Sequence, residues 1–424
     1  MLMDWIYWVQ TLRADNLLPI ITVLMMIDAP RYAWSLMLMA ICDLPAAFRR
    51  DVPISKVSEY SPNVTVLIAG HNESKTIART MEAVWTDCPH IQMIVIDDGS
   101  TDGMSIAAKA FAAGKPEITV IRRSVRGGKS SALNLGLLYA RGDVVVTIDA
   151  DSRPGRGAIA ELVQPLADSG IAAVSGSVRA WNPFDCLVTR LQAYEYRQTI
   201  FMSRMARARL GLLGIVSGAF GAFRTSALRH VGGWDVGPGE DGDIVLRLRK
   251  AGYRITAASR AECLTNVPVS WMRLFRQRCR WDRTVITFEC RKHADMGFVS
   301  GRQFRWSCFL MTLERWLFNV VFVYSFWLGT LLLFSTGSRD PLYLSLLLYA
   351  CNVILELVQF LVLICYSDKV RHDLTLGIVL PLYPIYQLFL KTVDLYALTR
   401  EILIRDSGTD SFVPDHVRNA TWRF

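Results

Sequence analysis

Two aspartates, Asp149 and Asp151, follow a run of β-forming residues that extends from Val144 to Thr147. Side chains two positions apart on a strand point to the same side, and like charges held that close repel each other. A magnesium ion is commonly bound by one or two carboxylates together with phosphate oxygens of a substrate. The pair therefore predicts a site where a divalent cation and a diphosphate balance the two negative charges. The alternative is a turn at the end of a strand, capped by the two aspartates.

Two more acidic pairs stand where ligands can be bound. Asp97 and Asp98 end an apolar segment, and Glu240 and Asp241 come just before an amphipathic segment with a helical pattern. Helix capping is the alternative for the second pair, because acidic residues are common at helix N-termini. In open α/β sheets, ligands bind beyond the carboxyl ends of the strands. We therefore expect the clusters that follow strands, at Asp97 and at Asp149, to converge on one edge of a sheet.

The segment RGGKSS, residues 126–131, can bind phosphate, although it is not a Walker A loop. That motif requires a glycine five residues before its Gly-Lys pair, and this position holds Arg123. Gly127 and Gly128 can still direct backbone N–H groups at a phosphate, and Lys129 can supply an ammonium group. A plain glycine turn before an amphipathic helix is the alternative.

Arginine and tryptophan gather in the segment RQRCRW, residues 276–281. Its Gln277, Arg280 and Trp281 can together bind a diphosphate and stack on a sugar face. For an isolated cluster of this kind, an Arg/Trp belt beside a membrane is the favoured alternative. A long basic stretch, residues 184–214, can pack beside such a site, lie on anionic lipid headgroups or present a solvated face.

Strands and helices alternate in the region that positions these residues. Short Val/Ile-rich runs predict strands at residues 64–70, 92–100, 117–123 and 143–152. Helical patterns lie between them at residues 74–85, 101–113 and 129–140. This alternation predicts an α/β domain with a mostly parallel sheet.

The hydrophobic residues, 52% of a 424-residue chain, are concentrated near its two ends. Towards the C-terminus, segments 317–335 and 342–365 are each long enough to span a bilayer. Segment 374–390 contains Pro381 and Pro384, so a broken, re-entrant or interfacial course is open for it.

The N-terminal apolar segment, residues 17–42, is interrupted by charges and a proline from Asp28 to Arg31. It forms either one kinked crossing or an interfacial stretch followed by a crossing helix that starts near Pro30. Arg49 and Arg50 follow, so the positive-inside rule places the next domain in the cytoplasm. The first residues lack the basic region and cleavage site of a signal peptide.

The net charge of +9 suits an anionic partner. With strongly apolar ends, lipid and a phosphorylated substrate are favoured over nucleic acid. Nine scattered cysteines without a CxxC pair predict neither a zinc site nor a disulfide framework.

The order of the motifs along the chain narrows the function. The four motifs are, in order, Asp97-Asp98, Asp149-x-Asp151, Glu240-Asp241 and Gln277-x-x-Arg280-Trp281. With membrane spans after them, this order resembles the processive membrane-embedded glycosyltransferases of family 2. These are the cellulose, chitin, hyaluronan and poly-N-acetylglucosamine synthases, including the rhizobial chito-oligosaccharide synthase. The resemblance is close from Val64 to Trp281 and extends to the flanking spans in layout only.

The resemblance implies a GT-A fold, which is an α/β, Rossmann-like domain with a mostly parallel sheet, flanked by transmembrane and interfacial helices. We expect an N-terminal membrane or interfacial region at residues 1–50 and the glycosyltransferase domain at residues 51–300. C-terminal interfacial and transmembrane helices with a short tail would occupy residues 301–424. The expected location is the bacterial inner membrane, with several crossings and a cytoplasmic catalytic domain.

On the donor side, the resemblance gives each residue a role. Asp98, together with Asp97, would contact the uridine of a UDP-sugar. Asp149 and Asp151 would hold Mg²⁺ or Mn²⁺ against the diphosphate, and Lys129 would lie near the nucleotide.

On the acceptor side, Asp241, next to Glu240, would be the general base that takes the proton of the acceptor hydroxyl. Gln277, Arg280 and Trp281 would bind the end of the growing glycan and the leaving diphosphate.

The implied function is processive, inverting β-transfer of a glucose-type or N-acetylglucosamine-type sugar from UDP to a growing glycan, with passage of the glycan across the inner membrane. One alternative is a non-processive transferase that acts on a polyprenyl phosphate or glycolipid. The other is a non-catalytic membrane component of polysaccharide export. The lipid bilayer is an expected partner and nucleic acid is not, and the resemblance leaves room for a homo-oligomer or export subunits.

Three features depart from the family pattern. AGHNES, residues 69–74, stands where relatives have Pro-x-x-Asn-Glu, and Gly239 replaces the usual threonine before Glu240. There is also no recognisable gating-loop sequence and no C-terminal cyclic-di-GMP domain, so activity without that regulator is expected.

The second C-terminal span carries a polar stripe of Asn352, Glu356 and Gln359. These residues fall on one helical face. They line the exit route of the glycan or form hydrogen bonds between helices, and both alternatives are open.

Overall fold

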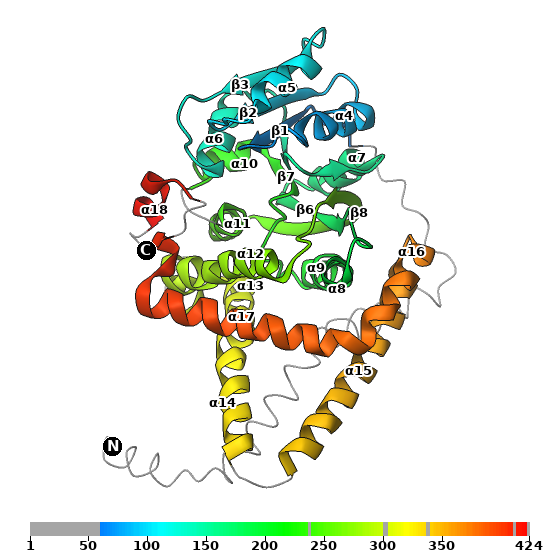
Figure 1. Cartoon of the computed structure of the whole chain (residues 1–424). Coiled ribbons are helices and arrows are strands. Elements are labelled where there is room, and N and C mark those ends of the chain that lie inside the picture. Colours follow the sequence, from blue (N-terminus) through cyan, green and yellow to red (C-terminus); the bar gives the residue numbers. More distant parts are fainter. Residues whose placement is uncertain (1–59, 236–238, 300–303, 336–339, 410–412, 422–424) are drawn as a thin grey trace.

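The computed structural model describes residues 60–235, 239–299, 304–335, 340–409 and 413–421 (Figure 1). The predicted N-terminal region, residues 1–50, lies outside the described residues. At the centre of the α/β domain is an eight-stranded sheet with the order β3-β2-β1-β4-β7-β6-β8-β5.

The four strands that the sequence predicts are parallel neighbours: β1 (Val64–Gly70), β2 (Gln92–Asp97), β3 (Ile118–Arg122) and β4 (Val144–Asp149). Continuous Val/Ile runs form them because strands of a parallel sheet are buried on both faces. The other four strands are β5 (Arg153–Pro154), β6 (Ile171–Ala180), β7 (Phe220–Arg224) and β8 (Arg254–Thr265). β7 is antiparallel to β4 and to β6, so the sheet is mixed but mostly parallel, as predicted.

Helices cover both faces of the sheet. On one face, α4 (Ile77–Asp87), α5 (Met104–Ala112) and α7 (Ala158–Val163) pack on the side chains of alternate strand residues such as Val66 and Ile68. On the other face, α6 (Lys129–Tyr139), α10 (Thr225–His230) and α11 (Glu240–Lys250) pack on the intervening residues, such as Leu67. The result is a three-layer α/β/α domain with two apolar layers, which holds the strand ends rigidly in place.

The register of the sheet sets the positions of the acidic pairs. Asp97 is paired with Gly70 of β1, and Asp149 is paired with Ala69 of the same strand. Both aspartates therefore lie at the carboxyl edge of the sheet, on either side of the end of β1. The predicted convergence of these two clusters on one edge is confirmed.

Three stretches of the described residues are helical, long and apolar enough to cross a membrane: Trp306–Leu331, Ser345–Tyr366 and Val370–Ile404. Figure 1 shows α14 (Phe322–Ser335) and α15 (Asp340–Tyr366) extending from the same side of the α/β domain. These two helices correspond to the first two predicted C-terminal spans.

The third stretch does not run parallel to the other two. In Figure 1, α17 (Tyr383–Ile404) lies crosswise to α14, along α12 (Trp271–Thr284). The rings of Trp271 and Phe389 are in contact there, 5.0 Å apart. This course favours the broken or interfacial alternatives for residues 374–390 over a straight crossing.

The polar stripe of α15 is largely buried against other elements. The Glu356 carboxylate accepts hydrogen bonds from Gln198 (2.5 Å), Tyr194 (3.1 Å) and Gln387 (2.9 Å), and it is 2% exposed. These contacts join α15 to the α/β domain and to α17. They support the hydrogen-bonding alternative for this residue over a glycan path.

Candidate active site

Asp98 fixes the loop before α6. Its carboxylate accepts hydrogen bonds from the backbone N–H groups of Gly127 (2.8 Å) and Gly128 (2.7 Å) and from the Arg123 guanidinium (3.1 Å). Gly128 has a φ of 84°, which glycine adopts without strain. The glycine loop is thus held at the end of β2, beside the end of β4. Because both N–H groups donate to Asp98, the prediction that Gly127 and Gly128 direct them at a phosphate is wrong. The contact between Asp98 and uridine stays a prediction.

Asp97 stabilises the turn after β2. Its carboxylate accepts a hydrogen bond from the N–H of Ser100 (2.8 Å) and lies 3.9 Å from the Arg122 guanidinium. The side chain is almost fully buried. Asp97 therefore shapes the loop next to Asp98, and its own predicted contact with uridine remains a prediction.

Lys129, the first residue of α6, joins two of the acidic motifs. Its Nζ lies 2.5 Å from the Asp149 carboxylate and 3.2 Å from the Glu240 carboxylate. A methyl group added at Gly218 would lie 3.2 Å from that Nζ and 3.3 Å from Oδ2 of Asp241. Residues more than 100 positions apart in the sequence, such as Lys129 and Asp241, therefore face the same small space.

We call Lys129, Asp149, Asp151, Glu240 and Asp241 the carboxylate–lysine cluster. Burial raises the pKa of Asp149 to about 6; the Asp151 charge adds to this rise and Lys129 opposes it. Burial also raises the pKa of Asp151 and that of Asp241, where the neighbouring Glu240 adds to the rise. Burial is the first cause in each case, so ionisation of these carboxylates is costly. The cluster also contains four carboxylates and one ammonium group, that of Lys129.

A divalent cation fits this cluster. Within the described part of the chain, no three His, Cys, Asp or Glu side chains form a metal site by themselves. Mg²⁺ needs only one or two carboxylates when phosphate oxygens and water complete its coordination. Asp149 and Asp151 are such a pair, and a dication would stabilise the ionised form of both carboxylates, which burial disfavours.

Gly239, one of the three departures from the family pattern, has a packing reason. Its φ is 87°, and an added Cβ would lie 2.6 Å from Cγ2 of Thr284 on α12. A threonine in this backbone position would be strained and would collide with α12. The glycine lets the start of α11, which carries Glu240 and Asp241, approach the helix that carries the predicted acceptor motif.

The predicted acceptor motif lies on α12, and its arginine Arg278 was missed by the sequence analysis. The Arg278 guanidinium lies 2.9 Å from the Glu195 carboxylate and 4.4 Å from the ring centre of Trp281. Tyr386 of α17 donates a hydrogen bond to the same Glu195 oxygen at 2.6 Å. Trp281 is 43% exposed, so a buried charge pair supports a ring that remains open to a ligand. The available sequence signal for this ion pair was Glu195, the single glutamate in the basic stretch at residues 184–214.

The acceptor motif and the carboxylate–lysine cluster are neighbours. Gly239, which precedes Glu240 of the cluster, packs against Thr284, three residues after Trp281 on α12. Gln277, on the same helix as Arg280 and Trp281, has a buried Oε1 without a hydrogen-bond partner among the described residues. The structure thus brings all four motifs to one region. The roles of Gln277, Arg280 and Trp281 toward a glycan stay predictions.

The basic stretch at residues 184–214 packs inside the molecule. It forms α8 (Leu187–Tyr196), a π-helical segment (Arg197–Met202) and α9 (Ser203–Arg209). Arg197 is 2% exposed and lies 2.9 Å from the Asp373 carboxylate. Since Glu195 of the same stretch forms an ion pair with Arg278, the stretch packs beside the predicted acceptor motif, and the alternative of a wholly solvated face is wrong.

A second contact that the sequence gave no sign of comes from the C-terminus. The helix α18 (Asp415–Thr421) lies on the glycine loop before α6. His416 Nε2 is 3.4 Å from the Gly127 carbonyl oxygen, and an added Cβ on Gly128 would lie 3.1 Å from the buried Val417 side chain. The chain therefore returns over almost 290 residues to the glycine loop.

Comparison with known proteins agrees with this arrangement. Residues 65–232 match the model of glycosyl transferase family 2. The chain contains a family 2 glycosyltransferase domain. The matched residues include β1, the glycine loop and Asp149-x-Asp151, and the recognition of the family from its motifs is confirmed.

Relatives of the family 2 domain are found among bacterial proteins. The chain is 31% identical over 245 residues to a probable glycosyltransferase of Bacillus subtilis, which covers 56% of this chain and 58% of that protein. It is 28% identical over 237 residues to a poly-β-1,6-N-acetyl-D-glucosamine synthase of Staphylococcus epidermidis, covering 55% and 57%. The chain thus spans somewhat more than half the length of the curated relatives that it matches.

A solved structure confirms the GT-A fold. A mannosyltransferase from Pyrobaculum calidifontis, solved in complex with GDP-mannose and Mn²⁺, superposes with a TM-score of 0.61 at 19% identity. The match covers 90% of this chain and 99% of that one. At this identity the likeness concerns the fold, and it includes helices beyond the α/β domain because so much of both chains is covered.

Proposed function

We propose that this chain is a membrane-bound inverting β-glycosyltransferase that builds a polysaccharide processively from a UDP-sugar, with Mg²⁺ or Mn²⁺ as cofactor. The observation that carries the proposal is the bridge from Asp149 through Lys129 to Glu240, which joins the predicted metal motif to the predicted base motif. The names of the staphylococcal relatives favour N-acetylglucosamine as the sugar.

Asp241 suits the role of general base. Inverting transfer needs a group that takes the proton of the acceptor hydroxyl as that oxygen attacks the anomeric carbon. Burial and Glu240 raise the pKa of Asp241, which makes the carboxylate a better proton acceptor near neutral pH. Its charge also faces Arg204, which donates a hydrogen bond to the Ser175 hydroxyl at 3.0 Å and so lies fixed beside the base.

The leaving diphosphate would be met by positive charge. Lys129 Nζ and the N–H groups at the start of α6 lie where the diphosphate of a bound nucleotide would rest. Asp149 and Asp151 would hold the divalent cation, which supplies Lewis-acid stabilisation of the diphosphate when bound. Trp281 and its neighbours on α12 would receive the acceptor sugar, whose ring can stack on the exposed indole.

A non-processive transferase that acts on a polyprenyl phosphate or glycolipid is the second candidate. It is favoured by one observation: the solved structure that matches 90% of this chain is a mannosyltransferase. This candidate keeps the roles of the carboxylate–lysine cluster and changes the acceptor and the sugar nucleotide.

One experiment separates the two candidates. The purified full chain in lipid nanodiscs is incubated with radiolabelled UDP-N-acetylglucosamine, UDP-glucose or GDP-mannose and with Mg²⁺ or Mn²⁺. Polymer from a UDP-sugar supports the proposal, and a single sugar on an added lipid acceptor supports the second candidate. No transfer with any donor, together with no binding of UDP, contradicts both.

A further inference from the structure

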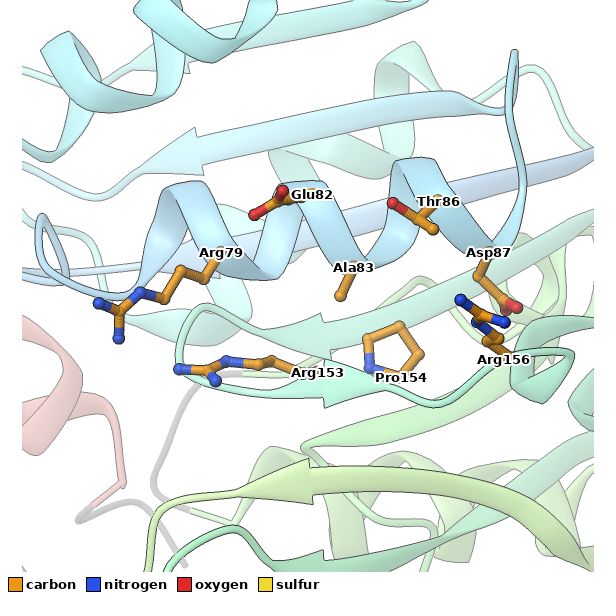
Figure 2. Close-up of a pocket in the computed structure, with 8 residues that line it drawn as sticks. All are labelled: Arg79, Glu82, Ala83, Thr86, Asp87, Arg153, Pro154 and Arg156. Atoms are coloured by element: carbon orange, nitrogen blue, oxygen red, sulfur yellow. The ribbon is translucent and has the colours of Figure 1, made fainter.

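Two groups of charged residues outside the carboxylate–lysine cluster are not used by the proposed function. The first lines a groove of about 400 Å³ between α4 and the segment around β5 (Figure 2). Both signs of charge line this groove, since Glu82 and Asp87 accompany its arginines, and Asp87 accepts hydrogen bonds from N–H groups at the start of α7. The groove therefore has no single charge that would select a ligand. The second group is buried in the first turn of α11, behind the proposed base.

Asp243 is the centre of this second group. It lies two residues after Asp241 on α11 and is fully buried. One oxygen of its carboxylate lies 2.8 Å from Nε2 of His293 and 2.7 Å from Nζ of Lys292. The other oxygen accepts a hydrogen bond of 2.8 Å from Nε of Arg247. Because residues two apart on a helix face different directions, Asp243 holds the turn from the side opposite to the cluster.

Lys292 binds acidic residues on both sides of the Glu240-Asp241 motif. Its Nζ lies 2.7 Å from the carboxylate of Asp235, which precedes the motif, and 2.7 Å from that of Asp243, which follows it. The Lys292 side chain is 10% exposed, so both contacts are shielded from water. One ammonium group therefore ties the chain before and after the motif to a single point.

The residues that hold this turn belong to the helix that carries the predicted acceptor motif. α12 continues directly into a π-helical segment (Val285–Lys292), and His293 follows that segment. Figure 1 shows α11 next to α12, and Gly239 packs against Thr284 at the end of α12. Short π-helical segments within α-helices are frequent at functional sites. The turn with the proposed base and the acceptor motif are thus attached to one continuous helix.

We propose that Lys292 and Asp243 are positioning residues, which fix the Asp241 carboxylate relative to the acceptor motif on α12. Proton transfer needs the base within hydrogen-bond reach of the acceptor hydroxyl, and a displacement of about 1 Å can lower a rate by about 10²-fold. The two residues act through the backbone of α11 and do not take part in the chemistry. This inference rests on the proposed function and deepens it, because it explains how the base is held against the acceptor.

The test compares Lys292→Met with the unaltered full chain in nanodiscs. Methionine keeps an unbranched stem and removes the ammonium group, while Asp243 keeps Arg247 and His293 as partners. Release of UDP gives the rate, expressed per molecule that binds UDP in calorimetry. We expect kcat to fall about tenfold or more, whereas the donor KM and the UDP affinity should change less than about twofold. A merely structural role would lower the number of binding molecules and leave kcat per binding molecule unchanged.

Three further variants make this comparison specific. Lys250→Met is the matched control, because Lys250 lies at the other end of α11 and pairs with Asp295 at 2.6 Å; its kcat should stay within about twofold. Lys292→Arg keeps a cation within reach of both Asp235 and Asp243 and should recover most of the lost rate. Lys292→Gln, which keeps a hydrogen-bond donor, replaces Lys292→Met if the methionine variant binds no UDP.

The double variant Asp241→Asn with Lys292→Met shows whether the two residues act together. A residue that only positions the base adds no further loss once the base is gone, so the double variant should be as active as Asp241→Asn alone. An unchanged kcat in Lys292→Met, an equal loss in Lys250→Met, or losses that multiply in the double variant would overturn the positioning role. If the unaltered protein transfers no sugar, or if Asp241→Asn keeps full activity, the proposed function fails and the inference fails with it.

Discussion

The carboxylate–lysine cluster and the contact between the α/β domain and the C-terminal helices both bury charged groups. They differ in how far each buried charge is neutralised by a partner of opposite sign. In the cluster, four carboxylates share Lys129 and the nearby Arg204, and the pKa values of Asp149 and Asp241 are raised. At the contact with the C-terminal helices, buried charges have close partners of opposite sign, as in the pairs Arg197–Asp373 and Arg278–Glu195.

The difference distinguishes charged groups that are suited to bind a ligand from charged groups that stabilise the fold. A buried ion pair with good geometry is complete, and breaking it costs stability. A buried cluster with unbalanced charge lowers stability by itself and gains from a ligand of the missing charge.

The largest expected effect concerns the unbalanced cluster. Asp241→Asn should lower the rate of sugar transfer by about 10²–10⁴-fold, because the acceptor hydroxyl loses its general base. UDP affinity should change less than about twofold, since the proposed contacts to the diphosphate come from Lys129 and from a cation on Asp149 and Asp151. The rate is measured by release of UDP and the affinity by calorimetry. Equal losses of rate and UDP affinity would remove Asp241 from the role of base.

Breaking a buried ion pair at the contact with the C-terminal helices should lower the stability of the protein. Asp373→Asn leaves the buried guanidiniums of Arg179 and Arg197 with Glu262 as their remaining charge partner, so unfolding should become easier by about 3 kcal/mol, the lower end of the range for breaking a buried pair. The control is Asp168→Asn, which breaks an exposed pair with Arg254 and should change the melting temperature much less. Thermal melting in nanodiscs measures both variants. Similar melting temperatures for the two would contradict the distinction between the regions.

Much of the donor side could be predicted because its signals are local. The Val/Ile runs fix the strands, and the rule that parallel strands present their carboxyl ends at one edge places Asp97 and Asp149 together. The bridge by Lys129 from Asp149 to Glu240 depends on how α11 returns to the sheet, and no local pattern contains that information. The resemblance to family 2 predicted that the two motifs share a site, but it did not predict the bridge itself.

The contacts between the α/β domain and the C-terminal helices could hardly be predicted, because they join residues that are far apart in the sequence. Arg278 meets Glu195 across 83 positions, and His416 meets Gly127 across 289. Such contacts are set by how helices pack at long range, so composition showed only a basic stretch. Long-range packing also places the polar stripe on α15. Glu356, which the sequence left open as part of a glycan route, is buried and accepts hydrogen bonds from three residues.

The next expected effect is a dependence on pH of the stabilisation that a divalent cation gives to the carboxylate–lysine cluster. Asp149 holds its proton up to about pH 6 in the folded state, compared with an ordinary pKa of 3.8. Between these values the folded state binds more protons than the unfolded state, so the contribution of Asp149 to stability falls as pH rises through this window. A divalent cation favours the ionised carboxylate. Its stabilising effect should therefore be larger near neutral pH than at about pH 5.

This effect is measured as the rise in melting temperature with Mn²⁺ at the two pH values. At a hundredfold excess over its dissociation constant, the ion should add about 2.7 kcal/mol near neutral pH. In Asp149→Asn the dependence of this rise on pH should largely disappear. A rise that is equal at both pH values in the unaltered protein would show that the ion does not bind at Asp149.

The smallest expected effect concerns α18, which packs on the glycine loop before α6, on the donor side of the candidate site. Val417→Asp places a carboxylate against Gly128 and removes a buried apolar contact, so α18 should leave the glycine loop. UDP affinity should then fall by about three- to tenfold, because the loop loses one of its supports and the new charge repels the diphosphate. Asn419→Asp adds the same charge at an exposed position of the same helix and separates these two causes. If both variants weaken UDP equally, charge alone acts, and the packing of Val417 on the loop has no part in binding.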